Sequence, residues 1–262
     1  DDTLSFASRL HQEDFRVVAI PKTMDNDVFG TDYCIGFSTA VTRSVDAITN
    51  FRTSVGSHER IGVVELFGRN SGETSLYAAY LADVDRAVIS EVPFDLDRLA
   101  TFLVEDRERN PSNYAMLTIS EGAHPVGGQI VEKGEEDAYG HRKLGGIGDQ
   151  IGTALKDASA KYNKGRRIDV VNQRLGYLVR SGDPDALDSI VPMVFGNLAL
   201  GLVGKKQYGR LVSIHRGFYD TVPISSVTSE KKFVDIKKYY NTERLRPIYQ
   251  FDGAPLFIVT SD

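Results

Sequence analysis

Short apolar runs alternate along the chain with longer segments in which apolar residues recur at helical spacing. Residues 16–20 form a short run rich in β-branched side chains that ends at Pro21, which predicts a buried strand whose carboxyl end leads into a loop. From Tyr33 to about Thr53, apolar residues recur near every third or fourth position and predict a long helix. The first predicted unit is therefore a strand followed by a loop and a helix.

The same alternation continues through residue 119. Strands are predicted at 61–66, 86–89 and 114–119, helices at 73–81 and 96–108, and a glycine-containing loop at 67–72. Such alternation indicates an α/β fold whose parallel sheet is covered by helices on both faces. Ligands of these sheets bind beyond the carboxyl ends of the strands. The loops after Ile20, Leu66 and Ile119 all lie at that edge.

The pattern is less regular after residue 123. Residues 124–146 are rich in glycine and charge, with an acidic cluster at 132–137, and are interpreted as a surface excursion. The predicted elements after it are a helix at 147–162, a strand at 168–175, a loop through Asp183, a helix at 186–202, a strand at 210–214 and a short helix at 233–240. Pro192 is expected to mark a start or a kink of the helix at 186–202.

Composition narrows the class of protein. A formal net charge of −5 over 262 residues argues against non-specific binding to nucleic acid, which requires a basic face. Cys34 is the only cysteine, so no intrachain disulfide can form; we expect a cytoplasmic protein with Cys34 in its core. The most apolar stretch, residues 194–203, is short for a membrane span, so we expect no membrane segment.

The densest group of reactive side chains follows the first predicted strand. Residues 21–27 read Pro-Lys-Thr-Met-Asp-Asn-Asp, which places a cation, a hydroxyl and two carboxylates on one loop. Phosphoryl transfer uses such a set: one carboxylate accepts a proton from the attacking hydroxyl, another serves Mg²⁺, and Lys22 neutralises phosphate charge. A polar turn without chemistry is the competing interpretation, because Asp and Asn favour turns.

Three later loops carry weaker signals. Residues 67–72 place Arg69 between two glycines, where guanidinium and backbone could face a phosphate. Glu121 follows the strand at 114–119 and could bind sugar hydroxyls, while residues 176–182 offer Tyr177 and Arg180. Each motif alone is more typical of an ordinary solvated loop.

Together, in this order, the motifs resemble the phosphofructokinase family over nearly the whole chain. The most specific part is Lys22 to Asp27 followed by Gly-Thr-Asp at 30–32 and Gly-Phe-Ser-Thr-Ala at 36–40. The resemblance implies a three-layer α/β fold with a parallel sheet and two Rossmann-like lobes. It also implies that the chain is a fragment lacking its amino-terminal part, because Asp1 stands where the family has an Asp that serves Mg²⁺.

The resemblance also implies boundaries and roles. Residues 1–20 would be the remainder of the donor-binding lobe, and residues 21–262 the sugar-phosphate-binding lobe with elements that return to the first. Asp25 would be the base toward the 1-hydroxyl of fructose 6-phosphate, Asp27 would assist, and Arg69 would stabilise the transferring phosphoryl group. The implied substrate-binding residues are Thr23, Met24, Asp25, Asp27, Arg60, Phe67, Gly68, Arg69, Glu121, Tyr177 and Arg180.

Two roles concern the oligomer and the sugar 6-phosphate. Arg60 matches an arginine that in the family reaches a neighbouring subunit's site, so the resemblance implies a homodimer or homotetramer. Arg180 with Tyr177 would hold the 6-phosphate. Three positions depart from the family pattern. Tyr177 stands where many members have His, and Phe67 stands where members often have Met. Residues 171–174 lack an Arg at the expected place, although Arg174 could substitute for it.

The resemblance bears on the phosphoryl donor through Asp2 and Lys22. ATP-using members have Gly after the metal-binding Asp; a carboxylate there would face an anionic phosphate at a cost of several kcal/mol, or roughly a thousandfold in affinity. Lys22 replaces a Gly of bacterial ATP enzymes and binds pyrophosphate in pyrophosphate users, although some ATP-dependent relatives also carry it. The pair predicts a reversible, Mg²⁺-dependent enzyme that uses pyrophosphate.

Two alternatives stay open at this point: an ATP-dependent phosphofructokinase, and a non-catalytic regulatory subunit. Asp25, Asp27 and Arg69 argue against the regulatory subunit, since a sensor needs no base. A dehydrogenase of the Rossmann type is disfavoured because no predicted strand is followed by a G-x-G-x-x-G fingerprint.

Overall fold

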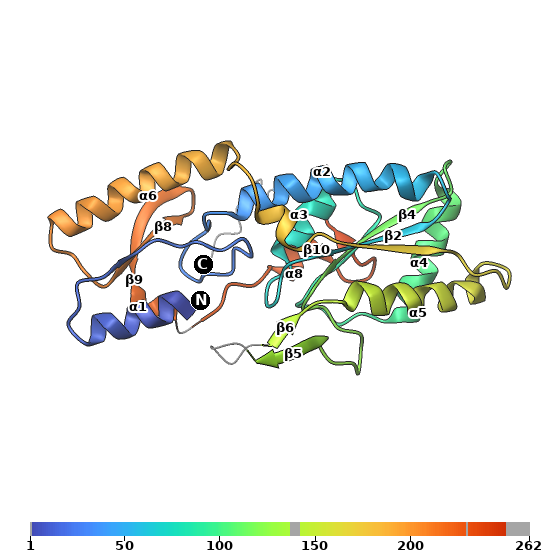
Figure 1. The fold of residues 1–262 in the computed structure, drawn as a ribbon, viewed down its shortest axis with the longest axis horizontal. Helices are drawn as coiled ribbons and strands as arrows, with labels where there is room; N and C mark the ends of the chain where they lie inside the picture. The colour runs from blue at the N-terminus through green and yellow to red at the C-terminus, as the bar shows by residue number, and fades with distance from the viewer. Residues whose placement is uncertain (1, 137–141, 229, 250–262) are drawn as a thin grey trace. The chain divides into compact units, whose positions relative to one another are not determined.

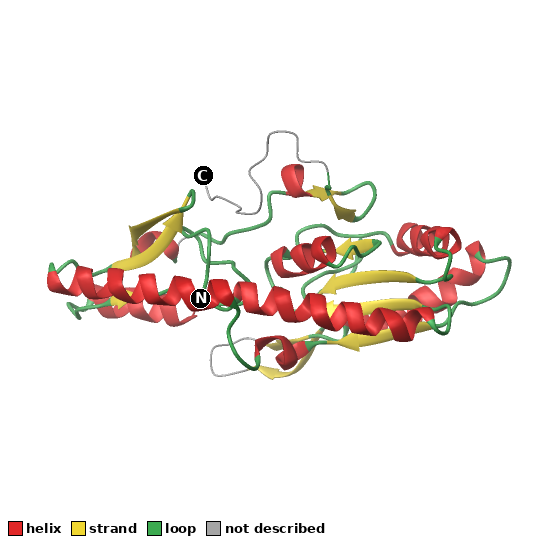
Figure 2. Cartoon of the chain, turned by 90° about the horizontal axis from the view of Figure 1, so that it is seen from above, coloured by secondary structure: helices red, strands yellow, loops and turns green. Residues whose placement is uncertain are grey.

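The computed structural model describes residues 2–136, 142–228 and 230–249. These residues form an α/β structure that divides into two compact units (Figures 1 and 2). Among the described residues, unit 1 contains those of 2–40 and 182–233, and unit 2 contains those of 41–181 and 234–249. Each unit therefore collects segments that are distant in sequence. Their boundaries differ from the sequence-based division after residue 20, and the assignment of donor and sugar binding to lobes stays a prediction.

Unit 2 is built on a four-stranded parallel sheet in the order β3-β4-β2-β7. Its strands are β2 (Ile61–Leu66), β3 (Arg86–Val88), β4 (Ala115–Ser120) and β7 (Val170–Arg174). Every residue of β2 and β4 is buried, as expected of central strands covered on both faces. The predicted parallel sheet is confirmed.

Helices cover both faces of this sheet (Figure 1). The helices are α2 (Phe37–Gly56), which begins in unit 1, α3 (Glu73–Leu81), α4 (Leu96–Arg109) and α5 (Ile147–Tyr162). Ile61 and Val63 join the apolar core formed with α4 and α5, whereas Gly62, on the opposite face of β2, lies against Val55 of α2. Asp95 caps α4 by accepting a hydrogen bond from the backbone N–H of Arg98.

Smaller elements complete unit 2. These are the hairpin β5 (Glu132–Glu136) and β6 (Arg142–Leu144), the 3-10 helix η1 (Gly176–Arg180), the helix α8 (Ile236–Tyr239), and the pair β10 (Tyr240–Asn241) and β11 (Arg246–Pro247). The surface excursion predicted at 124–146 thus contains a hairpin. Residues 137–141 of that excursion, including the last residue of the acidic cluster, lie outside the described residues.

Unit 1 holds a three-stranded sheet in the order β1-β8-β9. Its strands are β1 (Val18–Ala19), β8 (Arg210–His215) and β9 (Phe218–Pro223), and its helices are α1 (Asp2–Gln12), the start of α2, α6 (Ala186–Gly204) and α7 (Ile224–Val227). β1 pairs parallel to β8, and β9 pairs antiparallel to it. Cys34 is fully buried in the apolar core of this unit, as expected.

Helix α6 is apolar over nearly its whole surface. It begins at Ala186, so Pro192 lies inside the helix and does not mark its start. Leu187, Ile190, Met193, Leu200 and Val203 are exposed large apolar side chains on this helix. With 19 residues and a mean hydropathy of 1.7, it is longer than the apolar stretch singled out from the sequence and, by length and composition alone, could cross a membrane. A helix that other protein segments cover can have the same composition.

Candidate active site

The sequence-predicted site residues fall into two groups, one in each unit. Unit 1 contains Lys22, Thr23, Met24, Asp25 and Asp27. Unit 2 contains Arg60, Phe67, Gly68, Arg69, Glu121, Tyr177 and Arg180. Asp1 lies outside the described residues, and Asp2 begins helix α1, its side chain also lying outside what the structure describes.

The unit 1 loop is fixed largely by Asn26. Its side chain donates from Nδ2 to the carbonyl of Asp32 over 3.0 Å and accepts from the backbone N–H of Cys34 over 2.7 Å. Asn26 has a φ of 54°, a left-handed conformation that Asn tolerates better than most residues. The amide therefore ties residues 25–27 to the segment at 32–34, and the predicted turn preference of Asn contributes directly to the loop that carries the carboxylates.

Two further contacts shape this loop around Asp25 and Asp27. The backbone N–H of Asp25 donates to Oγ1 of Thr23 over 3.2 Å, so Thr23 stabilises a local turn. The carbonyl of Asp27 accepts from the backbone N–H of Lys232 over 3.2 Å, and Asp27 is 5% exposed. Lys22 is exposed, whereas Asp25 is half-buried. One loop thus presents an accessible cation and a partly accessible carboxylate.

In unit 2, six predicted residues gather at the carboxyl edge of the sheet. Phe67, Gly68 and Arg69 follow β2, Glu121 follows β4, and Tyr177 and Arg180 lie on η1 just after β7. β2 pairs with both β4 and β7, so the three loops are neighbours. The loops after Leu66 and Ile119 thus share one edge, as predicted. The loop after Ile20 was predicted at the same edge but follows β1, which belongs to the separate sheet of unit 1, so that part of the prediction is wrong.

The loops after β2 and β4 are joined through their backbones. The N–H of Gly122 donates to the carbonyl of Gly68 over 3.2 Å, and the N–H of Glu121 donates to that of Leu66 over 2.9 Å. Oγ of Ser90 also donates to the carbonyl of Gly68, over 2.5 Å. Gly68 has a φ of +134°, and a Cβ there would lie 2.5 Å from the carbonyl oxygen of Ser71, so only glycine fits.

The charge of Glu121 is set by burial and by the arginines around it. Burial raises the pKa of the Glu121 carboxyl to about 7, against the opposing effect of the Arg69 guanidinium, while the carboxylate of Glu65 raises it further. Arg180 also acts to lower this pKa. A carboxyl group that titrates near neutrality at a strand end is typical of a functional site.

Arg60 lies apart from this group. It precedes β2, at the amino end of the strand, whereas Phe67 follows the carboxyl end. The two residues therefore lie at opposite ends of strand β2. The role implied for Arg60, at a neighbouring subunit's site, stays a prediction that requires a second copy of the chain.

Glu65 and Arg174 form an ion-pair network that the sequence did not assign. Nε of Arg174 lies 2.8 Å from Oε1 of Glu65, whose carboxylate also accepts from the backbone N–H groups of Gly146 and Gly148 over 2.8–3.0 Å. Glu65 is a charged residue in an otherwise apolar buried strand. This was the only feature of the sequence that could have indicated the network. The Glu65 carboxylate stabilises the amino end of α5.

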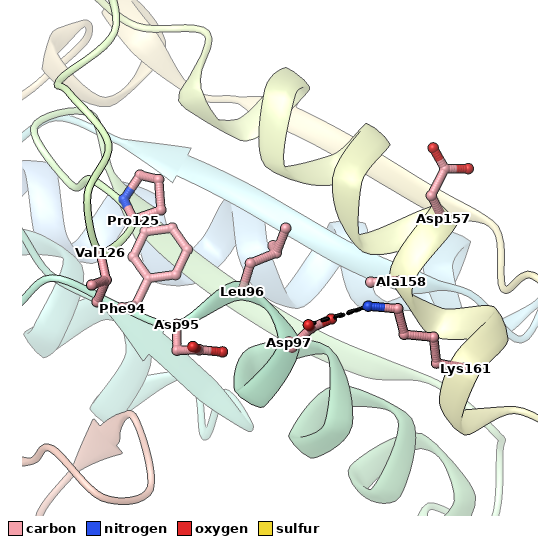
Figure 3. Close-up of a pocket in the computed structure, with 9 residues that line it drawn as sticks. All are labelled: Phe94, Asp95, Leu96, Asp97, Pro125, Val126, Asp157, Ala158 and Lys161. Atoms are coloured by element: carbon pink, nitrogen blue, oxygen red, sulfur yellow. Dashed lines mark hydrogen bonds and ion pairs between the residues drawn. The ribbon is translucent and has the colours of Figure 1, made fainter.

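A cavity of about 490 Å³ in unit 2 contains none of the predicted site residues (Figure 3). It is lined by residues of α4 and α5, including Lys161, by Phe94 just before α4, and by Pro125 after β4. Nζ of Lys161 lies 2.8 Å from Asp97 within the cavity. Lys161 is the only cation that lines this cavity among the described residues, and it is already paired, so the cavity makes a poor site for an anionic substrate.

Comparisons with known proteins identify relatives of this chain. Residues 1–203 match the sequence profile of the family described as Phosphofructokinase. The chain is 33% identical to a pyrophosphate–fructose 6-phosphate 1-phosphotransferase of Amycolatopsis methanolica, over 93% of this chain and 69% of that protein. It is 32% identical to an ATP-dependent 6-phosphofructokinase of Mycobacterium leprae, over 91% of this chain and 68% of that protein.

A solved structure supports the fold. The pyrophosphate-dependent phosphofructokinase of Marinobacter aquaeolei superimposes with a TM-score of 0.72 at 17% identity, over 95% of this chain and 62% of that one. The chain thus spans about two thirds of the length of the proteins that it resembles. The profile match and the identity to curated relatives together show that the chain belongs to the phosphofructokinase family.

Proposed function

We propose that the protein transfers a phosphoryl group from pyrophosphate to the 1-hydroxyl of D-fructose 6-phosphate, giving fructose 1,6-bisphosphate and phosphate, and that it catalyses the reverse reaction as well. The observation that carries this proposal is the gathering of Arg69, Glu121 and Arg180 at one edge of the unit 2 sheet. The group offers two guanidinium groups for phosphate and one carboxyl for sugar hydroxyls.

The proposed step assigns one task to each residue. Asp25 accepts the proton of the 1-hydroxyl as its oxygen forms a bond to the transferred phosphorus, and the bridging bond of pyrophosphate breaks to release phosphate. Arg69 and Lys22 stabilise the negative charge on the transferring group. Glu121 binds sugar hydroxyls, and Arg180, with the Tyr177 ring against it, binds the 6-phosphate.

Mg²⁺ is the proposed cofactor. Within residues 2–136, 142–228 and 230–249, no group of three or more His, Cys, Asp or Glu could hold a metal ion. Mg²⁺ is commonly bound through only one or two carboxylates plus substrate phosphates, and Asp1 with assistance from Asp27 would supply them. When bound, Mg²⁺ would neutralise charge on the transferring phosphates.

The choice of pyrophosphate over ATP rests on Asp2 and Lys22. Relatives named for either donor are 33% and 32% identical to this chain, so similarity alone does not separate them. A carboxylate at position 2 would repel the additional phosphate of a nucleotide, and the exposed Lys22 would attract pyrophosphate. We further propose a cytoplasmic homodimer or homotetramer in which Arg60 serves the neighbouring site.

The test is turnover of fructose 6-phosphate with Mg²⁺, offering pyrophosphate and ATP in parallel and detecting fructose 1,6-bisphosphate through aldolase. Activity with pyrophosphate alone would support the proposal. Activity with ATP alone would refute the donor assignment and leave the family intact. Inactivity with both donors would favour the alternative of a regulatory subunit.

A further inference from the structure

The guanidinium group of Arg180 lies between two aromatic rings. Its central carbon is 4.5 Å from the ring centroid of Phe67 and 4.4 Å from that of Tyr177, and the two rings meet edge to face with centroids 6.1 Å apart. Phe67 follows β2, whereas Tyr177 and Arg180 belong to η1. Within the described residues, no carboxylate forms an ion pair with Arg180.

Arg174, the last residue of β7 and three residues before Tyr177, makes different contacts. Its Nε is paired with Glu65, which is 3% exposed at its side chain and also accepts the backbone N–H groups at the start of α5. A Cβ on Gly145 would lie 2.0 Å from Nη2 of Arg174, so the guanidinium is packed against that backbone. Releasing Arg174 would leave a buried carboxylate without its cation.

We propose that Phe67 and Tyr177 are positioning residues that hold Arg180 as the arginine for a phosphate monoester, and that Arg174 serves the α5 network instead. The inference rests on the proposed function, in which a phosphorylated sugar binds at this edge. An aromatic ring attracts a guanidinium through its face. The N–H donors of a planar guanidinium point outward within its plane, where they can bind phosphate in bidentate fashion.

The two rings also reduce the cost of binding. An exposed arginine loses considerable side-chain freedom when it is fixed on a ligand. Contacts with Phe67 and Tyr177 restrict Arg180 before the ligand arrives, so less freedom remains to be lost. Tyr177 is 75% exposed, so its ring contributes little to the core, and it contacts both Phe67 and Arg180.

The inference is tested by titration calorimetry with fructose 6-phosphate and with unphosphorylated fructose, beside steady-state kinetics. Phe67→Leu and Tyr177→Leu remove a ring and are each expected to weaken fructose 6-phosphate binding about fivefold, the effect of one exposed cation–π contact. Tyr177→Phe keeps the ring and is expected to stay within about twofold. Arg180→Lys is expected to lose at least about tenfold, because an ammonium cannot bind phosphate bidentately.

In kinetics, the ring variants are expected to raise KM for fructose 6-phosphate with little change in kcat, since they alter binding and not the transfer step. Leu178→Ala is a matched control, because Leu178 is an exposed residue of the same 3-10 helix. Arg174→Gln is expected to lower the melting temperature while weakening binding less than Arg180→Gln does.

A loss in Tyr177→Phe as large as that in Tyr177→Leu would overturn the inference, because it would assign the effect to the hydroxyl. A loss in Arg174→Gln as large as that in Arg180→Gln would also overturn it, as would no binding of fructose 6-phosphate by the unmodified protein. Absence of turnover with either donor, combined with the expected order of affinities, would refute the proposed function and leave the inference standing. Normal turnover with unchanged KM in both ring variants would refute the inference and leave the proposed function standing.

Discussion

The backbone of Gly122 lies directly against the carbonyl group of Arg69: a Cβ atom added to Gly122 would be 2.0 Å from that oxygen. The obstacle is backbone and not the flexible end of a side chain, so it cannot move aside cheaply. Arg69 and Glu121 are therefore held together by the close approach of their two loops, and the identity of residue 122 is part of how the site is built.

Gly122→Ala is expected to destabilise the fold by about 1–3 kcal/mol, the usual cost of overpacking, and to reduce kcat/KM by displacing Arg69. Urea unfolding and the coupled assay measure the two effects. Gly201→Ala is the matched control, because nothing lies within 4 Å of its added Cβ in helix α6. An effect of equal size in the control would contradict this explanation.

Asp188 connects helix α6 to the segment that begins α2. Its carboxylate accepts from the hydroxyl of Tyr33 over 2.6 Å, from the N–H of Gly36 over 2.8 Å, and from the N–H and Oγ1 of Thr39 over 2.9 and 2.5 Å. Asp188 is 5% exposed. Burial, together with the hydrogen bond from the Tyr33 hydroxyl to Asp188, raises the pKa of Tyr33. Removing the carboxylate would leave several buried donors without a partner.

Asp188→Ala is therefore expected to lower the free energy of unfolding by about 3 kcal/mol, whereas Tyr33→Phe, which removes one of the donors, is expected to cost about 1 kcal/mol. Chemical denaturation of both variants gives the comparison. Equal losses would show that the other three hydrogen bonds contribute little.

The elements that sequence predicted best are those whose pattern is local and strong. The fully buried strand at Ile61–Leu66 and the amphipathic helix at Ile147–Tyr162 have the predicted bounds. The helix expected from Tyr33 begins instead at Phe37, because Gly36 has a φ of +103° and its N–H is bound by the distant Asp188. Strand β9 was missed: Phe218 and Tyr219 are exposed, and its pairing with β8 gives no apolar alternation.

For the site too, local patterns could be predicted and long-range contacts could not. The alternation of strands and helices predicted that the loops after Leu66 and Ile119 share an edge, because parallel strands end on the same side of a sheet. It did not show that the loop after Ile20 follows a strand of a different sheet. The partners of the arginines could not be predicted. Whether Arg174 contacts Glu65 or a ligand depends on side-chain packing across two strands, which no local pattern encodes.

Binding of fructose 6-phosphate is expected to strengthen as pH rises from about 6 to about 8. Burial raises the pKa of Glu121 to about 7, so the carboxylate, which accepts hydrogen bonds from sugar hydroxyls, forms over this range. Calorimetric titration at several pH values measures the trend. In Glu121→Gln the affinity should be lower and its pH dependence flatter; an unchanged pH profile in that variant would assign the titration to another group.

The raised pKa of Glu121 has the opposite consequence for stability. The folded protein holds this proton more tightly than the unfolded chain, whose carboxyl titrates near 4.5, so the contribution of Glu121 is full below that value and is lost as pH rises through about 7. The stability of Glu121→Gln relative to the unmodified protein should therefore increase between pH 5 and about 8.

Asp25→Asn is expected to lower kcat by about a hundred- to ten-thousandfold while leaving fructose 6-phosphate binding largely intact, because the amide keeps the shape of the carboxylate and cannot accept the hydroxyl proton. The backbone N–H of Asp25 binds Oγ1 of Thr23, so the loop does not depend on the carboxylate for that turn. Lost binding with retained turnover would remove the assignment of Asp25 as the base.

Replacing Asp2 tests the donor directly. Asp2→Gly removes both the charge and the bulk of the side chain, whereas Asp2→Asn removes the charge alone. If repulsion of a nucleotide phosphate excludes ATP, both variants should raise kcat/KM for ATP relative to pyrophosphate, by up to roughly a thousandfold for the removal of a like charge at close range.

If bulk is what excludes ATP, only Asp2→Gly should show the gain. Lys22→Gly, made separately, is expected to weaken the use of pyrophosphate without creating use of ATP, because it removes an attraction and leaves the repulsion at position 2. A preference for pyrophosphate that survives every one of these substitutions would locate the discrimination outside Asp2 and Lys22.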